Sequence, residues 1–456
     1  MISGLSRVSG DGHLVPLRVS TRAWFLISLQ TFGGPAGQIA VMHRTLVDEH
    51  RWIGERRFLH ALNYCMLLPG PEATQLAVYV GWLLNGAIGG VIAGVLFVLP
   101  GVAALLALSA LYAGFGETAL VAGLFAGLAP AVVAVVVQAV VRIGRRVLHH
   151  PLLVALAVAA FLALAVFQVP FPLVVLGAGL VGAVVHRWRP DVVSMPEESA
   201  DPDDEPPLVS DDALHAARPT GRRAALVLGI GIPLWLLPVA VAGLLAGGDS
   251  VYAQQGLFFS GTALVTFGGA YAVLSFVAQR AVEVYGWLAP GEMARGLALA
   301  ETTPGPLIMV VQFVAFLGAF RDPGALDPWT AGVVASLLTT WVTFVPCFLF
   351  IFLGAPYVER LRGNAALSAA MTGITAAVVG VIANLGVYFA THTLFDESHR
   401  AAFGPLTVEV PDLSTLDPVA LGVAAMAAVL LLRLRWSVLR TLAVCALVGL
   451  VAQFLI

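Results

Sequence analysis

Two short motifs occur twice in this chain, and both pairs are separated by the same distance. Phe32-Gly33-Gly34 recurs as Phe267-Gly268-Gly269, and Pro69-Gly70-Pro71 recurs as Pro304-Gly305-Pro306. Both pairs are offset by 235 residues (267 − 32 and 304 − 69). Both copies lie in apolar sequence and place helix breakers where a membrane helix would otherwise continue. Internal duplication with interrupted membrane helices is typical of secondary transporters.

The composition places the chain in a lipid bilayer. Of its 456 residues, 59% are hydrophobic and 11% are charged, whereas soluble domains carry about 25% charged residues. Apolar runs longer than about 18 residues indicate membrane-spanning helices. The three cysteines are far apart in apolar stretches. We therefore expect neither a disulfide framework nor a metal site.

The apolar runs predict an all-α polytopic membrane protein with about 13 transmembrane spans. The candidate spans are 22–43, 57–85, 88–114, 118–141, 151–168, 170–187, 224–246, 252–279, 292–319, 329–353, 365–391, 418–433 and 437–456. Further matches at offset 246, such as Pro100 with Pro346 and Gly127 with Gly373, extend each repeat to about six spans. The span 224–246 has no counterpart in the first half.

An acidic segment separates the two repeats. Residues 191–212 contain nine acidic residues, four prolines and no basic residue, a composition that favours disorder. We predict an N-terminal membrane repeat at 1–190, a disordered linker at 191–222 and a C-terminal membrane repeat at 223–456 with one extra helix. The linker acts as a tether between the halves, or alternatively as a regulatory docking site.

Counting spans predicts that the two repeats are inverted. The first repeat begins with span 1 and the second with span 8. These spans are seven apart, an odd number, so they run in opposite directions through the membrane. The distribution of arginine then places the N-terminus and the linker in the cytoplasm and the C-terminus in the periplasm. The segment 43–57 does not fit this arrangement. The span count places it outside the cytoplasm, although it holds four arginines. The alternative is that 57–85, and by analogy 292–319, is a re-entrant hairpin and not a crossing.

The repeated Pro-Gly-Pro turns predict anion-binding sites. Two prolines around a glycine end one half-helix and start another, which leaves backbone amides at the new N-terminus without helical partners. Such amides must face protein or a polar cavity in the membrane, and the helix dipole favours an anion there. The alternative is a tight kink with no ligand. The expected anion contacts are the backbones of Gly33, Gly34, Pro69, Gly70, Pro71, Gly268, Gly269, Pro304, Gly305 and Pro306.

Three charged residues lie next to these interruptions. Glu72 follows the first Pro-Gly-Pro turn, and Glu301 precedes the second. A charge in mid-membrane costs about 2.5–3.5 kcal/mol on insertion scales, so both are candidate proton carriers, with helix capping as the alternative. Arg44 is a candidate attractor for anions, with ordinary placement at the membrane interface as the alternative.

Longer stretches around these motifs resemble the chromate ion transporter family in its long, two-domain form. The N-terminal resemblance lies in Phe32-Gly33-Gly34-Pro35, His43-Arg44, Trp52-Ile53, Phe58-Leu59-His60-Ala61-Leu62-Asn63-Tyr64-Cys65 and Leu67-Leu68-Pro69-Gly70-Pro71-Glu72. Gly268-Gly269-Ala270-Tyr271-Ala272-Val273-Leu274 and Glu301-Thr302-Thr303-Pro304-Gly305-Pro306-Leu307 resemble the C-terminal repeat. The resemblance implies a bacterial inner-membrane secondary transporter that exports chromate and related oxyanions and confers chromate resistance.

The sequence therefore predicts an antiporter for chromate or sulfate-like oxyanions and no cofactor. Alternatives are a transporter of another anion, such as sulfate or a small organic acid, and an anion channel. An enzyme is disfavoured because no metal-hydrolase or phosphate-loop motif is present. The expected partners are the oxyanion and the lipid bilayer, with no nucleic acid, and a homodimer is left open.

Overall fold

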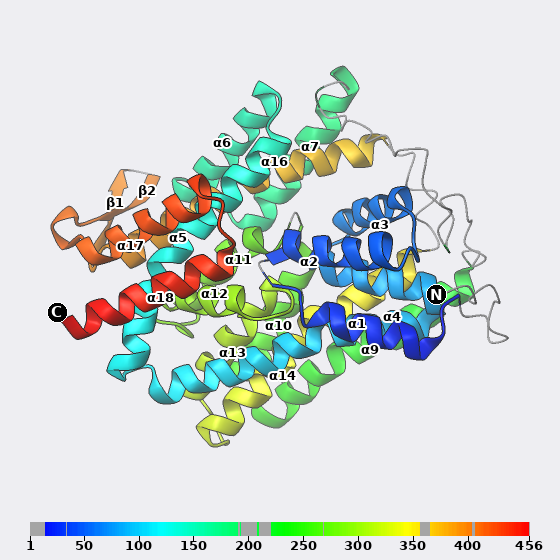
Figure 1. Ribbon diagram of the computed structural model, residues 1–456, viewed down its shortest axis with the longest axis horizontal. Helices are drawn as coiled ribbons and strands as arrows, with labels where there is room; N and C mark the ends of the chain where they lie inside the picture. Colours follow the sequence, from blue (N-terminus) through cyan, green and yellow to red (C-terminus); the bar gives the residue numbers. More distant parts are fainter. Residues whose placement is uncertain are drawn as a thin grey trace.

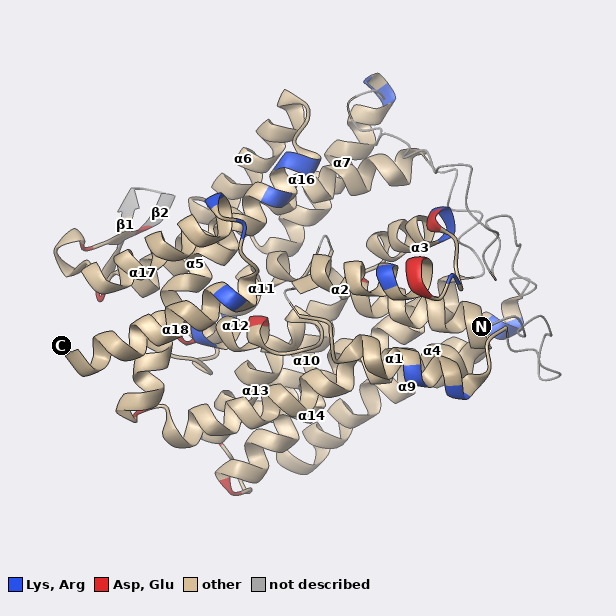
Figure 2. Cartoon of the chain, viewed as in Figure 1, with Lys and Arg blue, Asp and Glu red and all other residues tan. Residues whose placement is uncertain are grey.

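The fold is a bundle of helices, many of them short, seen in a computed structural model (Figure 1). It describes residues 14–32, 34–189, 192, 208, 220–267, 269–355, 365–403 and 406–455. Gly33, Gly268 and all but a few residues of the predicted linker lie outside the described residues. Figure 2 shows how few charged residues the helices carry.

The first half contains seven α-helices in its described part. Their bounds are α1 Leu17–Ser28, α2 Gly34–His43, α3 Glu55–Leu67, α4 Glu72–Phe115, α5 Ala119–Val147, α6 Pro151–Ala165 and α7 Phe171–Trp188, with a π-helical turn η1 at Arg44–Glu49 after α2. Each predicted span up to residue 85 is broken into shorter helices at the glycine and proline motifs.

The second half repeats this order. Its helices are α9 Gly221–Ala246, α10 Val251–Val265, α11 Ala270–Gln279, η2 Arg280–Val284, α12 Glu292–Thr302, η3 Leu307–Met309, α13 Val310–Arg321, α14 Pro328–Gly354, α16 Ala365–Leu394, η5 Leu413–Thr415, α17 Pro418–Ala428, η6 Val429–Arg433 and α18 Val438–Leu455. Asp327 begins α14 by accepting the backbone N–H groups of Trp329 and Thr330, and bonding to Thr330 holds the pKa of Asp327 below its usual value.

The sequence does not predict one element of the second half. Strands β1 Ser398–Phe403 and β2 Leu406–Pro411 form an antiparallel hairpin between α16 and α17. The hairpin lies beside α17 in Figure 1. It occupies the acidic loop that precedes η5, α17, η6 and α18.

The helix bounds extend the internal repeat to the end of the chain. At offset 235, α2 corresponds to α11 and α3 to α12, with bounds that agree within two residues. At offset 246, α5 corresponds to α16. At offset 267, α6 corresponds to α17 with η6, and α7 to α18. Among the described helices, α9 has no counterpart.

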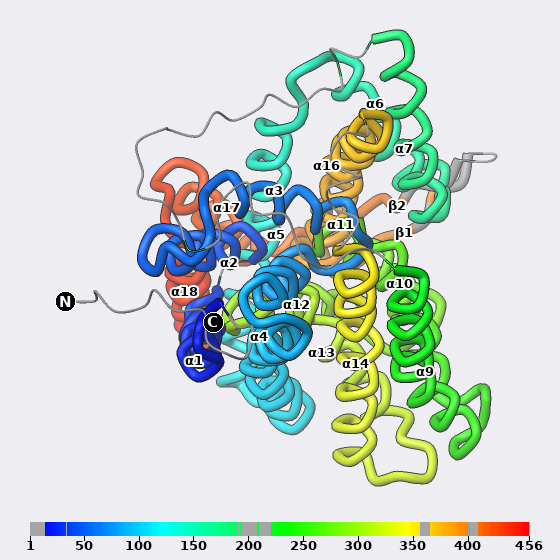
Figure 3. Tube along the Cα trace, turned by 90° about the vertical axis from the view of Figure 1, so that its right-hand side faces the viewer, coloured from blue at the N-terminus to red at the C-terminus, as the bar shows by residue number. Residues whose placement is uncertain are grey.

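Helix α4 is a hairpin of two antiparallel arms. Its backbone leaves the helical region at Asn85 and Gly86. Glycines then let the arms touch, because a Cβ placed on Gly81 would lie 2.6 Å from the carbonyl oxygen of Gly89. The Asn85 side chain also donates to the carbonyl of Val15, at 2.6 Å. The arms lie side by side in Figure 3.

The two halves exchange equivalent helix contacts. Helix α5 packs against α18, while its counterpart α16 packs against α7. Glycines permit both crossings: a Cβ on Gly127 would lie 1.8 Å from the oxygen of Cys445, and one on Gly373 would lie 2.5 Å from that of Ala178. Small residues commonly allow such close approach in membranes. Gly127 and Gly373, and likewise Ala178 and Cys445, are repeat equivalents, so the two crossings are equivalent contacts exchanged between the halves.

Seven of the described helices are long and apolar enough to cross a membrane: α4, α5, α7, α9, α14, α16 and α18. Three shorter apolar segments accompany them, at Pro151–Ala165, Leu307–Arg321 and Pro418–Arg433. The prediction of a multi-helical membrane protein is confirmed at this level. Its figure of about 13 spans stays a prediction.

An ion pair between the buried Glu292 and the half-exposed Arg321 fixes the start of α12. The guanidinium of Arg321 donates to both carboxylate oxygens of Glu292, each at 2.7 Å. The Tyr112 hydroxyl donates to the same carboxylate at 3.0 Å, and Arg295 donates to that hydroxyl at 2.9 Å. The network therefore joins α4, α12 and α13. The equivalent of Glu292 at offset 235 is Arg57, which is also buried but carries the opposite charge.

We expect Glu292→Ala to destabilise the fold by about 2 kcal/mol, in the range for lost hydrogen bonds to a charged group. The cost stays below that of breaking a fully buried pair, because the variant leaves behind Arg321, whose side chain is 44% exposed. Chemical denaturation of the purified protein in detergent measures the change. Asp322→Ala, at an exposed neighbouring carboxylate, is the control and should leave stability unchanged. Equal stability of the two variants would contradict the structural role of the pair.

Candidate functional site

The two Pro-Gly-Pro turns break the helices that they interrupt. Helix α3 ends at Leu67 and α4 begins at Glu72, while α12 ends at Thr302 and η3 begins at Leu307. Gly70 and Gly305 have φ angles of +123° and +101°, a backbone conformation that favours glycine. Both turns are therefore built in the same way, and both give a new helical start in the middle of the bundle.

Each turn binds the opposite half of the protein through an equivalent hydrogen bond. The Gly70 N–H donates to the carbonyl of Thr266 at 2.8 Å, and the Gly305 N–H donates to the carbonyl of Thr31 at 3.0 Å. Thr31 and Thr266 each end the segment just before a Phe-Gly-Gly motif and are themselves 235 residues apart. The four interrupted segments therefore meet in one region, and the contact is reciprocal.

Two glutamines complete the turns. The Gln75 side-chain amide donates to the carbonyl of Pro69 at 2.7 Å, and the Gln38 amide donates to the carbonyl of Gly305 at 2.6 Å. Both glutamines are buried. The carbonyl oxygen of the Gln75 side chain has no hydrogen-bond partner among the described residues.

Glu72 places its carboxylate at the start of α11. A Cβ on Gly269, the residue before α11, would lie 3.7 Å from Oε1 of Glu72 and 3.9 Å from Oε2. Glu72 is partly exposed and makes no ion pair or side-chain hydrogen bond with any described residue. A helix N-terminus attracts negative charge through its free amides. Glu72 of the first half therefore lies where an anion at α11 of the second half would bind.

Glu301 occupies a related position in the second half. The hydroxyl of Tyr271 donates to Oε1 of Glu301, while Oε2 has no partner among the described residues. Glu301 is 1% exposed. A Cβ on Gly34, where α2 begins, would lie 3.8 Å from the Tyr271 hydroxyl. Each half-helix start after a Phe-Gly-Gly motif thus faces an acidic group or a hydroxyl bound to one.

A family model for the chromate transporter matches residues 20–183 and 253–450 of the chain. The chain belongs to the chromate transporter family. A chromate transport protein of Pseudomonas aeruginosa is 34% identical to it over 78% of this chain and 76% of that protein. No solved structure matches the chain significantly.

Two further relatives support the assignment. A chromate transport protein of Cupriavidus metallidurans is 26% identical over 85% of this chain and 87% of that protein. A probable chromate transport protein of Synechococcus elongatus is 26% identical over 83% of this chain and 86% of that protein. The chromate transporter family is a family of transporters, not of enzymes. Its two matched segments leave out the acidic segment and α9, the helix without a repeat equivalent.

The structure gathers most of the residues that the sequence singles out, but not Arg44. The described turn residues lie in the exchanged contacts, and Glu72 and Glu301 lie beside them. The Arg44 guanidinium instead donates to the Gln30 side chain at 2.9 Å and lies 3.4 Å from Glu49. Its charge is compensated locally, so the structure gives no support to Arg44 as a free attractor. Gly33 and Gly268 lie outside the described residues.

Sequence reasoning missed Thr31, Thr266, Gln38 and Tyr271. The first two had a detectable signal, because the repeated motif is Thr-Phe-Gly-Gly when it is extended by one residue. Gln38 and Tyr271 have no polar equivalents at offset 235, where Val273 and Ala36 lie. Only the packing of the halves shows that they reach the turns. Among the described residues, no group of three or more His, Cys, Asp or Glu side chains could hold a metal ion.

Proposed function

We propose that this chain is a secondary transporter that exports chromate, and sulfate-like oxyanions, through the region where its two Pro-Gly-Pro turns meet. The observation that carries the proposal is the reciprocal pair of hydrogen bonds from Gly70 to Thr266 and from Gly305 to Thr31. Such a pair brings two broken helices of opposite halves to one place. Relatives named as chromate transport proteins, similar over most of their length, support the choice of substrate.

The anion binds to backbone amides at the half-helix starts. Those of α2 and α11 follow the Gly33-Gly34 and Gly268-Gly269 pairs, and that of α4 follows the first Pro-Gly-Pro turn. Amides at a helix start have no helical acceptor and bind oxyanions without any metal or cofactor. A tetrahedral dianion offers several acceptor oxygens to amides that come from more than one helix.

Glu72 couples transport to protons. Its carboxylate lies beside Gly269 at the start of α11, so the ionised form competes with a dianion for the same amides. Protonation removes that competing charge, because a neutral acid no longer repels the substrate. The dianion therefore binds more readily when Glu72 is protonated than when it is ionised. Release of the dianion and the proton outside and return of the empty transporter is symport and not proton exchange; it moves one net negative charge outward, so the membrane potential drives export.

Glu301 is the second proton carrier in this scheme. It is buried and lacks a partner for Oε2 among the described residues, and its bond to Tyr271 links it to the start of α2. A buried ionisable group in a membrane segment is a functional candidate by default. Glu72 and Glu301 have Leu307 and Met66 as repeat equivalents, so the two halves act differently despite their common fold.

The two halves are inverted in the membrane in this proposal. The exchanged contacts support a two-fold relation between them. Helix α3 has 13 residues and α12 has 11, so they are about 20 Å and 16 Å long. Neither helix alone reaches across a hydrocarbon core of about 30 Å, so in this proposal each segment crosses as a broken helix, together with the helix that follows its Pro-Gly-Pro turn. The N-terminus and the linker are placed in the cytoplasm, and the C-terminus in the periplasm, by the arginine distribution.

Reconstituted protein tests this function directly. Purified protein in liposomes should accumulate labelled chromate when a pH gradient or a membrane potential is applied, and excess sulfate should compete. Protein-free liposomes give the background. Single-channel currents across a planar bilayer would instead indicate an anion channel. Absence of any chromate or sulfate movement in protein that remains monodisperse would overturn the proposal.

A further inference from the structure

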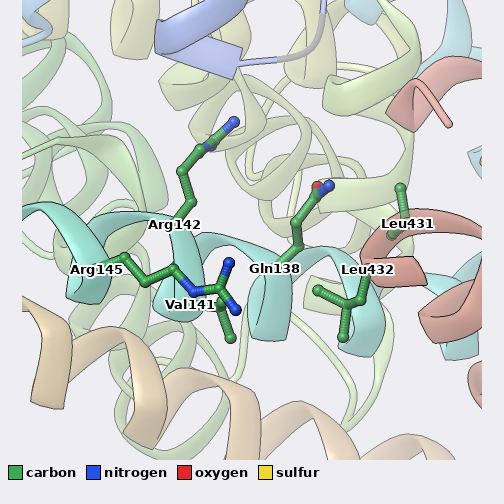
Figure 4. Close-up of a pocket in the computed structure, with 6 residues that line it drawn as sticks. All are labelled: Gln138, Val141, Arg142, Arg145, Leu431 and Leu432. Carbon is green, nitrogen blue, oxygen red and sulfur yellow. The ribbon is translucent and has the colours of Figure 1, made fainter. Parts of the chain in front are cut away.

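A cavity of about 450 Å³ lies along the C-terminal part of α5. Two elements form it, α5 of the first half and η6 of the second half. Figure 4 shows the Arg142 and Gln138 side chains projecting from α5 in the same direction, with Arg145 lying across the helix. The lining residues are Gln138, Val141, Arg142, Arg145, Leu431 and Leu432.

The polar lining of this cavity consists of two cations and one amide. Arg142 and Arg145 are both exposed, and neither makes an ion pair or a side-chain hydrogen bond with any described residue. No carboxylate lines the cavity. The guanidinium of arginine matches the geometry of oxyanions and donates several hydrogen bonds. The Gln138 side chain adds a further donor one helical turn away.

The cavity adjoins the candidate site. Helix α5, which carries Arg142, packs against α12, which carries Glu301 near its C-terminal end, and Glu301 accepts a hydrogen bond from Tyr271. Tyr271 in turn lies beside Gly34 at the start of α2. An anion held by Arg142 would therefore lie along the helix that packs beside the one carrying Glu301. Arg142 also offsets part of the repulsion that an anion meets near the Glu301 carboxylate.

We propose that this cavity binds a doubly charged tetrahedral oxyanion, held by Arg142 and Gln138, on the path to the interrupted helices. The inference rests on the proposed function and adds to it a side-chain site distinct from the backbone amides. Its volume exceeds that of one such ion, so the anion enters with part of its hydration shell. The same chemistry would suit a lipid phosphate, and the experiment below separates the two sources.

Calorimetric titration of the purified protein with sulfate tests the cavity without requiring transport. We expect Arg142→Gln to weaken sulfate binding about tenfold or more, since it removes hydrogen bonds to a charged group. Arg142→Lys should lose less, because it keeps the charge. Arg146→Gln is the matched control, an exposed arginine on the same helix outside the cavity lining, and should bind as the wild type does.

Each outcome supports or overturns the site. Unchanged sulfate affinity in Arg142→Gln overturns it, even if chromate transport by the wild-type protein is normal. If Arg142→Gln does not fold, Gln138→Leu decides, with severalfold weaker binding expected. Mass spectrometry shows whether the wild-type protein retains phosphatidylglycerol and whether Arg142→Gln loses it. If both hold and sulfate binding is unaffected by the substitution, the cavity binds lipid and the proposal is overturned. Failure of liposome transport with intact, Arg142-dependent sulfate binding would reject the function and keep the site.

Discussion

Glu72→Gln should abolish the pH dependence of oxyanion transport while leaving the protein folded. In the wild-type protein, apparent affinity for the dianion should fall as the pH rises through the titration of Glu72. The fall should reach about tenfold per pH unit, because binding is linked to one proton. Glutamine keeps the shape of the side chain but never carries the competing charge. Transport by the variant should therefore show high affinity at all pH values and no response to a pH gradient.

Sulfate is the better substrate for this measurement, because it stays doubly charged across the neutral range while chromate itself takes up a proton. The readout is the apparent KM for sulfate in liposomes at several pH values, with and without a pH gradient. Glu117→Gln, at an exposed carboxylate between α4 and α5, is the control and should retain the slope of the wild type. A pH slope in Glu72→Gln equal to that of the wild type would exclude Glu72 as the coupling group.

The sequence predicts the interruptions well because their cause is local. Proline and glycine break helices wherever they occur, so Pro69-Gly70-Pro71 and its copy could be placed without knowledge of the fold. The repeat offset of 235 likewise predicts that α3 and α12 are equivalent. The third offset, 267, could not be found from the sequence. The bounds of α7 and α18 agree at this offset, but few of their residues are identical.

The partners of the interruptions could not be predicted, because they depend on how the halves pack. Nothing in the sequence around Glu72 shows that its carboxylate lies beside Gly269 of the other half. The same holds for Gly305, which is bonded by Thr31 and Gln38 of the first half. Sequence proximity to the first motif points to Arg44, whereas Arg142, about 100 residues later, lies on α5, the helix that packs against α12 and its Glu301.

Gly70→Leu and Gly305→Leu should each reduce oxyanion transport at least tenfold. A side chain at such a φ angle costs about 1–3 kcal/mol, and at these two positions it also meets other atoms. A Cβ on Gly70 would lie 2.9 Å from the Gln75 side-chain nitrogen, and one on Gly305 would lie 3.2 Å from Cα of Gly101. Both substitutions therefore force the turn, or the groups packed against it, to shift.

Gly324→Leu separates this effect from backbone strain alone. Gly324 also has a positive φ angle, +61°, but a Cβ there would meet nothing within 4 Å. Its replacement should lower stability slightly and leave transport intact. Since the two turns exchange equivalent hydrogen bonds, the double variant of Gly70 and Gly305 should be little worse than either single variant. Such non-additivity is expected of groups that act as one unit. Independent, multiplicative losses would mean that the turns work separately, and the reciprocal contact would then have no functional role.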